Sequence, residues 1–141
     1  MFQGTVFHTI DDKGRVLVPP RFRLSLGERF VVTFGLRRTL SLYTADAWHG
    51  ILAKLKDHGD FNPSANTLRT FFAGGAEEVT TDAQGRLTLP APHREFAGLE
   101  NEVVSVGTVS KVDIWAKSRW QAFYENVDDA RIEEAIRELN L

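Results

Sequence analysis

The chain contains no cysteine, which excludes disulfides, thiolate nucleophiles and cysteine-ligated zinc or iron–sulfur sites. It also lacks the long apolar runs of membrane spans, and its first residues do not form the apolar stretch of a signal peptide. We therefore expect no membrane partner and a cytoplasmic location. Hydrophobic residues still make up 43% of the 141 residues, which is enough to build a folded core.

Sequence motifs of common enzyme sites are missing as well. No P-loop, G-x-G-x-x-G or G-x-S-x-G motif is present. The four histidines show no metal-ligand spacing, so we interpret each as a surface or turn residue: His8, His49, His58 and His93. The sequence thus predicts no enzymatic activity, no cofactor and no bound metal.

Positive and negative charges nearly balance overall, but the positive charge is unevenly distributed. The net charge is −2, yet residues 1–40 contain seven basic and three acidic residues, and the last 17 residues are strongly acidic. Because phosphate binding depends on clustered positive charge, this asymmetry is typical of a protein with one basic face. Ordinary scatter of surface charge is the alternative interpretation.

An internal repeat organises the chain. DDKGRVLVPPRFR at 11–23 aligns without gaps on DAQGRLTLPAPHR at 82–94, and residues 31–52 align on 103–124 after a single-residue insertion. Both copies keep Asp-x-x-Gly-Arg followed by Pro-x-x-x-Arg. The chain therefore consists of two copies of one unit.

The Asp-x-x-Gly-Arg element predicts a tight turn. Alternating apolar and polar residues on both sides of it favour a β-hairpin in each copy. Gly14 and Gly85 can adopt a positive φ, and Asp11 and Asp82 can accept hydrogen bonds from turn amides. These four residues are the expected structural motif.

Helices are expected after the turns. Pro19 and Pro90 fit the first turn of a short helix, and a second strand pair follows in each copy. Thr44 is expected to cap a longer amphipathic helix. We expect Trp48 and Trp120 to be core residues, because they lie on the apolar stripes of the predicted helices.

A unit of roughly 45 residues can hardly bury enough surface to fold alone. We therefore predict a β-rich α+β fold in which hairpins from two tandem units complete one core and form one pseudo-twofold barrel with additional helices. The expected repeats span 5–47 and 76–119, and the helical extensions span 48–75 and 120–141.

Turn formation does not explain the retained arginines. Arg15 and Arg86 can pair with the aspartate four residues earlier, or project outward as a guanidinium fork for phosphate or guanine, and both roles can coexist. The first copy is the more basic, because Gln84 in the second copy replaces a lysine. The candidate DNA-binding residues are Lys13, Arg15, Arg21, Arg23 and Arg86.

The start MF-x-G, the element D-x-K-G-R-x-x-x-P-x-x-x-R and the second D-x-x-G-R resemble the MraZ family over nearly the whole chain. This resemblance implies two tandem swapped-hairpin units of the SpoVT-AbrB type, a ring-like homo-oligomer and transcriptional control at the bacterial division and cell-wall gene cluster. It also implies double-stranded DNA with promoter repeats as the partner, and association with the nucleoid. An antitoxin-like or other protein-interaction module remains the alternative.

Overall fold

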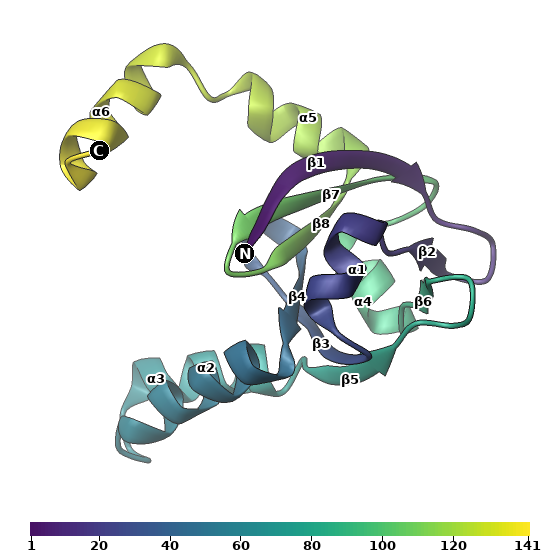
Figure 1. Ribbon diagram of the computed structural model, residues 1–141. Helices are drawn as coiled ribbons and strands as arrows, with labels where there is room; N and C mark the ends of the chain where they lie inside the picture. The colour runs from purple at the N-terminus through teal and green to yellow at the C-terminus, as the bar shows by residue number, and fades with distance from the viewer.

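The computed structural model describes residues 1–141 and contains eight strands in two sheets (Figure 1). The larger sheet has six strands in the order β1-β7-β8-β4-β3-β5, and all its neighbouring strands are antiparallel. The smaller sheet is an antiparallel ribbon of β2 and β6. The strands are β1 Phe2–Thr9, β2 Arg15–Leu17, β3 Arg29–Phe34, β4 Leu40–Thr44, β5 Glu77–Thr80, β6 Arg86–Thr88, β7 Glu102–Val109 and β8 Val112–Ala116.

Six α-helices and two shorter helical segments complete the chain. They are α1 Pro20–Leu26, the 3-10 turn η1 Leu36–Arg38, α2 Ala45–Asp57, α3 Pro63–Leu68, the π-helical segment η2 Arg69–Ala73, α4 Ala91–Ala97, α5 Lys117–Glu125 and α6 Asp129–Leu139. The cap expected at Thr44 is confirmed, since its hydroxyl oxygen accepts a hydrogen bond of 3.1 Å from the amide of Ala47.

The two units exchange their first strands. β1 pairs over its full length with β7 of the second unit, from Phe2 opposite Val109 to Thr9 opposite Glu102. In the equivalent exchange, β5 of the second unit pairs with β3 of the first. Equivalent strands of the two units also pair with each other: β4 with β8 in the large sheet, and β2 with β6 in the small ribbon. This arrangement confirms an α+β fold built from two related units.

The local hairpin expected around each turn is much shorter than the sequence pattern suggested. The segments flanking the first turn are linked by an isolated bridge between Ile10 and Val16 and by a hydrogen bond of 3.0 Å from the amide of Asp11 to the carbonyl oxygen of Arg15. Most of the pairing is instead between the units, since β1 pairs along its length with β7 and β2 pairs with β6. Barrel closure is not confirmed, because the strand order leaves β1 and β5 at the edges of the sheet.

One core serves both units. Phe22 and Phe30 of the first unit and Leu87, Leu89 and Ile114 of the second are each at most 1% exposed and belong to the same hydrophobic cluster. Complete burial of such a side chain contributes about 1.5–3 kcal/mol. Because each unit supplies only part of this cluster, the units are expected to fold together.

The short helices begin one residue later than expected. Pro19 and Pro90 are the N-cap residues of α1 and α4, with extended ψ angles of 137° and 148°. For Pro19 the cause is the following Pro20, whose ring disfavours a helical conformation in the residue before it.

The aromatic and histidine predictions have mixed outcomes. Trp48 is buried as expected, but Trp120 is only half-buried and packs edge-on against Phe7 at 5.2 Å between ring centroids. His93 contradicts the surface interpretation, because it is 4% exposed and its Nε2 lies 2.7 Å from the carbonyl oxygen of Gly75. Its position on the inner face of the short helix α4 was not visible in the spacing of the histidines.

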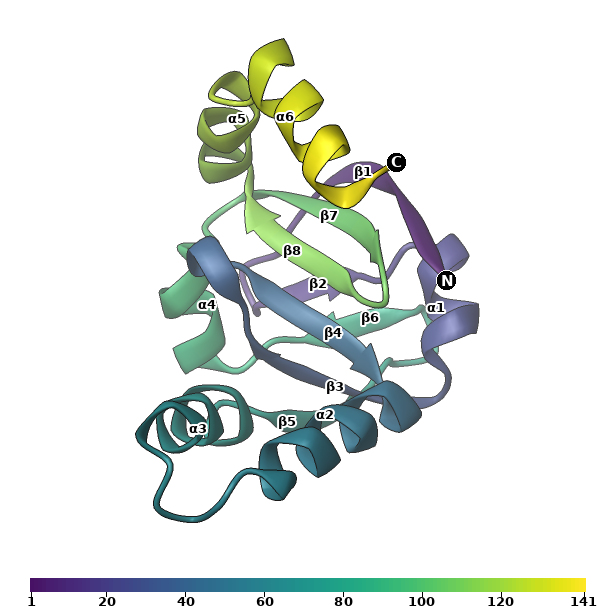
Figure 2. The same cartoon turned by 90° about the vertical axis from the view of Figure 1, so that its left-hand side faces the viewer.

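The helical extensions lie away from the β2–β6 ribbon. Figure 1 shows the two turns of the ribbon on one side of the sheet, and α2–α3 and α5–α6 reaching out on the other. In the view of Figure 2, the two helix pairs flank opposite ends of the large sheet. None of the helices has the length and apolar character needed to span a bilayer.

Candidate nucleic-acid interface

The first Asp-x-x-Gly-Arg turn is organised by one carboxylate. Asp11 Oδ1 accepts hydrogen bonds from the backbone amides of Lys13 at 3.0 Å and Arg15 at 2.8 Å, and Oδ2 accepts one from Arg15 Nε at 2.7 Å. The predicted pairing of Asp11 with Arg15 is thus confirmed. It fixes the direction in which the arginine side chain leaves the turn.

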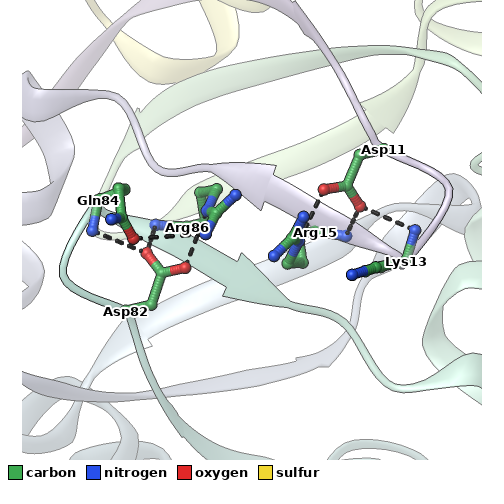
Figure 3. A network of polar contacts seen from close by, with 6 residues as sticks. All are labelled: Asp11, Lys13, Arg15, Asp82, Gln84 and Arg86. Atoms are coloured by element: carbon green, nitrogen blue, oxygen red, sulfur yellow. Dashed lines mark hydrogen bonds and ion pairs between the residues drawn. The ribbon is translucent and has the colours of Figure 1, made fainter.

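The second turn repeats this geometry (Figure 3). Asp82 accepts from the amides of Gln84 at 3.0 Å and Arg86 at 2.8 Å, and from Arg86 Nε at 2.8 Å. The substitution of glutamine for lysine adds one contact, because Gln84 Oε1 accepts a hydrogen bond of 3.3 Å from Arg86 Nη2. Arg86 is therefore held by two side chains, whereas Arg15 is held by one.

The turn glycines have the predicted conformation. Gly14 and Gly85 have φ angles of +76° and +79°, which residues with a Cβ rarely adopt. Their amides donate to the carbonyl oxygens of Asp11 at 3.1 Å and Asp82 at 2.9 Å. Both glycines are buried although they lie at the tips of turns.

The turn aspartates are held in their ionised form. The hydrogen bond from the backbone amide of Arg15 is the main cause that lowers the pKa of Asp11, and the Arg15 side chain and the Lys13 amide act in the same direction. The amide of Arg86 has the same effect on the pKa of Asp82. Each turn thus combines a fixed negative charge with an arginine that points away from the core.

The two turns meet in the β2–β6 ribbon. In its register Arg15 lies opposite Thr88 and Leu17 lies opposite Arg86. The central residues Val16 and Leu87 are each 1% exposed, so the flanking positions face outward because side chains alternate along a strand. Figure 3 shows the two arginines on neighbouring strands, between the two aspartates.

We name this outward surface, formed by Arg15, Leu17, Arg86 and Thr88, the ribbon face. Leu17 is 45% exposed. Sequence reasoning missed Leu17 and Thr88, although the alternation in RVL and RLT could have placed them on the same side as the arginines. It could not show that the two short strands pair with each other.

The remaining basic candidates are distributed around the ribbon face. Lys13 is exposed in the first turn, directly before Gly14. Arg21 is exposed on α1 and lies against β1, where its Nη1 is 2.5 Å from the position that a Cβ on Gly4 would occupy. Arg23 is half-buried, and its guanidinium lies against the second turn. The structure therefore unites Arg15 and Arg86, with Lys13 beside them, and places Arg21 elsewhere.

The charge of the turns is nearly balanced. The first turn carries Lys13 and Arg15 against Asp11 and Asp12, and the second carries Arg86 against a single aspartate. Long-range attraction of phosphate by one copy of this surface is therefore modest. The face offers directed guanidinium groups more than a broad basic field.

No group of three histidine, aspartate or glutamate side chains lies close enough together to hold a metal ion. The ribbon face offers hydrogen bonding and positive charge, both supplied by its arginines.

Comparison with known proteins gives a consistent result. The family model described as "MraZ protein, putative antitoxin-like" matches residues 1–71 and again residues 72–140. A protein of Desulfitobacterium hafniense named "Transcriptional regulator MraZ" is 43% identical over 141 residues, covering 100% of this chain and 99% of its own. A protein of the same name from Thermoanaerobacter pseudethanolicus is 41% identical over 143 residues, with both chains covered completely.

The double match of the family model reproduces the repeat seen in the sequence, and the relatives bear the name of a regulator. The duplicated turn, the exchanged strands and the full-length similarity agree with one another. The chain belongs to the MraZ family.

Proposed function

We propose that this protein is a transcriptional regulator that binds double-stranded DNA through the ribbon face. The observation that carries the proposal is the β2–β6 ribbon, where two arginines are held by aspartates on one outward surface. A two-stranded ribbon is one of the elements that the major groove of B-DNA admits. The names of the relatives support the same assignment.

In this proposal Arg15 and Arg86 read base edges. A guanidinium fork can bind the O6 and N7 acceptors of guanine, and an exposed apolar side chain such as Leu17 can contact a thymine methyl group. Lys13 and Arg21 contact phosphates and set the position of the ribbon. Because Arg86 is also bonded to Gln84, the first turn contributes more to binding than the second.

The modest charge of one ribbon face implies that several copies act together. Linking several weak contacts raises affinity without any new contact. Helix α6 offers a surface for self-association, because Ile132, Ile136 and Leu139 lie on one side of it and are 45%, 43% and 68% exposed. Figure 1 shows α6 extending away from the sheet, on the side opposite the ribbon turns.

We therefore propose a ring-like homo-oligomer that presents its ribbon faces to repeated sites in a promoter. The proposed targets are the division and cell-wall genes, which would place the protein in the cytoplasm on nucleoid DNA. Assembly through the helical extensions leaves the ribbon faces free, which is the geometry that this function requires.

Footprinting on DNA upstream of the gene of this protein tests the proposal. We expect regularly spaced protected sites, and retention of this DNA over random DNA of the same length. The affinity should fall steeply between 50 and 200 mM salt, as phosphate contacts require. Equal binding of both DNAs, or no binding at 50 mM salt, contradicts the proposal.

A protein-interaction module is the second candidate. The acidic, amphipathic α6 favours it, since Glu133, Glu134 and Glu138 accompany the exposed apolar residues. Co-purification of a different protein at a fixed stoichiometry, without retention of DNA, would support this candidate over the first.

A further inference from the structure

Each buried turn glycine lies under an arginine from the other unit. Arg94, on α4 of the second unit, covers Gly14 of the first turn: a Cβ built on Gly14 would lie 2.7 Å from Arg94 Cζ and 3.0 Å from its Cδ. Real Cβ atoms do not approach other atoms this closely. The guanidinium and its stem therefore pack directly over the glycine, and a Cβ at this position would displace them.

The second turn shows the same contact with the units exchanged. Arg23, on α1 of the first unit, covers Gly85: a Cβ there would lie 2.7 Å from Arg23 Cζ. Arg23 and Arg94 are the arginines of the repeated Pro-x-x-x-Arg element. Local turn formation does not explain why this element contains an arginine, and in the structure each of these arginines packs against the turn of the other unit.

Hydrogen bonds reinforce both contacts. The amide of Leu89 donates to the carbonyl oxygen of Gly14 at 2.9 Å, and the amide of Val18 donates to that of Gly85 at 2.9 Å. Arg94 Nη1 in turn donates to the carbonyl oxygen of Leu89. The first turn is thus held by a segment of the second unit through a backbone bond and a side-chain cover.

We propose that Arg23 and Arg94 are positioning residues that clasp the two DNA-reading turns crosswise, Arg94 on the first turn and Arg23 on the second. This inference rests on the proposed function, because its purpose is to hold Arg15 and Arg86 in a fixed orientation before DNA arrives. A reading side chain is effective only when its supporting contacts keep it in place. Arg23, which the sequence suggested as a phosphate contact, is thereby assigned to the turn it covers.

Arginine suits this role better than lysine. Its planar guanidinium can lie flat over the exposed Cα of a glycine while its nitrogens reach backbone carbonyls, whereas an ammonium group is a compact point charge. Replacement by lysine therefore keeps the charge and removes the cover. This distinction separates a clasp from a simple phosphate contact.

The direct test is amide hydrogen exchange by NMR on the full-length protein without DNA. In Arg94→Lys, the amides of Gly14 and Arg15 should exchange on the order of tenfold faster. The substitution removes the cover over Gly14, and it also removes the bond from Arg94 Nη1 to the carbonyl oxygen of Leu89, the residue whose own amide holds Gly14. The amides of Gly85 and Arg86 should be unchanged. In Arg23→Lys the pattern should be reversed, so that each substitution loosens the turn of the other unit.

Arg119→Lys is the matched control. Arg119 also covers a glycine, since its Cζ is 2.9 Å from the Cβ position of Gly98, and it donates to the carbonyl oxygen of Phe96 at 3.1 Å. Its substitution should leave both turns unchanged. Equal acceleration in both turns, acceleration in the turn of the same unit, or no acceleration in either Arg23→Lys or Arg94→Lys would overturn the proposal.

DNA binding adds a second readout. Arg94→Lys should reduce discrimination between upstream and random DNA more than Arg23→Lys, because it loosens the turn with Lys13 and Arg15. If Arg23→Gln lowers the salt slope by about one unit and leaves the exchange of Gly85 unchanged, Arg23 is a phosphate contact and the clasp is refuted. If the unaltered protein binds no DNA, the proposed function fails, while the exchange pattern still decides whether the clasp exists.

Discussion

Replacing Arg15 by alanine separates DNA recognition from support of the turn. The substitution removes one hydrogen bond to Asp11, that from Arg15 Nε at 2.7 Å. The two backbone amides that hold the same carboxylate, those of residues 13 and 15, remain available. The turn should therefore survive the loss of the guanidinium.

The two effects differ in size. The ion pair is partly exposed, with the side chains of Arg15 and Asp11 27% and 34% accessible, and pairs of this kind contribute about 0.2–1 kcal/mol. In a domain of this length, such a loss lowers the melting temperature by at most about 2–4 °C. A good bidentate contact with guanine, in contrast, provides about 1–3 kcal/mol of discrimination, or roughly 5–150-fold in affinity.

The assay measures DNA affinity and thermal unfolding on the same preparations. Arg15→Ala should lose most of its preference for upstream DNA at a temperature where it is fully folded, and Arg86→Ala should show a smaller loss. The inference is refuted if Arg15→Ala binds upstream DNA like the unaltered protein, or if binding is lost only in step with unfolding. Either result would mean that the ribbon face does not read bases through Arg15.

A fragment of residues 1–60 lacks β7, which pairs with β1, and β5, which pairs with β3. Circular dichroism and light scattering should show that it is unfolded or that it dimerises into a mimic of the whole chain; a folded monomer would contradict the shared core. Gly14→Ala should lower the free energy of unfolding by more than about 1–2 kcal/mol, the strain of a left-handed backbone, because the added Cβ also meets the guanidinium of Arg94. The loss should be smaller when Arg94→Ala is also present; an equal loss with and without Arg94→Ala would show that the cover exerts no steric constraint. Burial lowers the pKa of His8 below its usual 6.5, so below this pH the unfolded chain binds more protons than the folded chain and the free energy of unfolding should decrease. Urea titrations should show a smaller decrease between pH 7.5 and pH 5.5 for His8→Gln than for the unaltered protein; the same decrease in both would contradict a role for His8. Ile136→Asp, on the exposed side of α6, should lower the mass measured by light scattering while circular dichroism still shows the folded protein. A monomeric unaltered protein would contradict self-association.

The local part of the site could be predicted from the sequence, because its causes are local. The spacing of Asp11, Gly14 and Arg15 lies within a single turn, and the left-handed glycine and the i,i+4 ion pair follow from residue type. The structure has both features. The repeat also showed that a second turn of the same kind exists.

The pairing between the units could not be predicted, because it depends on contacts distant in sequence. A local hairpin and an exchanged strand satisfy the same alternation of apolar residues, and the choice depends on the core that both units fill. The same limit applies to Arg94. Its partner Gly14 is 80 positions earlier, and nothing in Pro-x-x-x-Arg indicates which turn it covers.

In the proposed mode of binding, the second turn contributes less to recognition than the first, yet its unit supports the first turn. If each turn were supported only by its own unit, the weaker second turn could lose its arginine at little cost to the first. In this fold the second unit supplies the amide of Leu89 and the guanidinium of Arg94 to the first turn. A unit with a reduced role in recognition would thus still be required to hold the other unit in its reading conformation. The two copies therefore form one ribbon, and under the proposed clasp a change of Arg23 or Arg94 in one copy is expected to loosen the turn of the other.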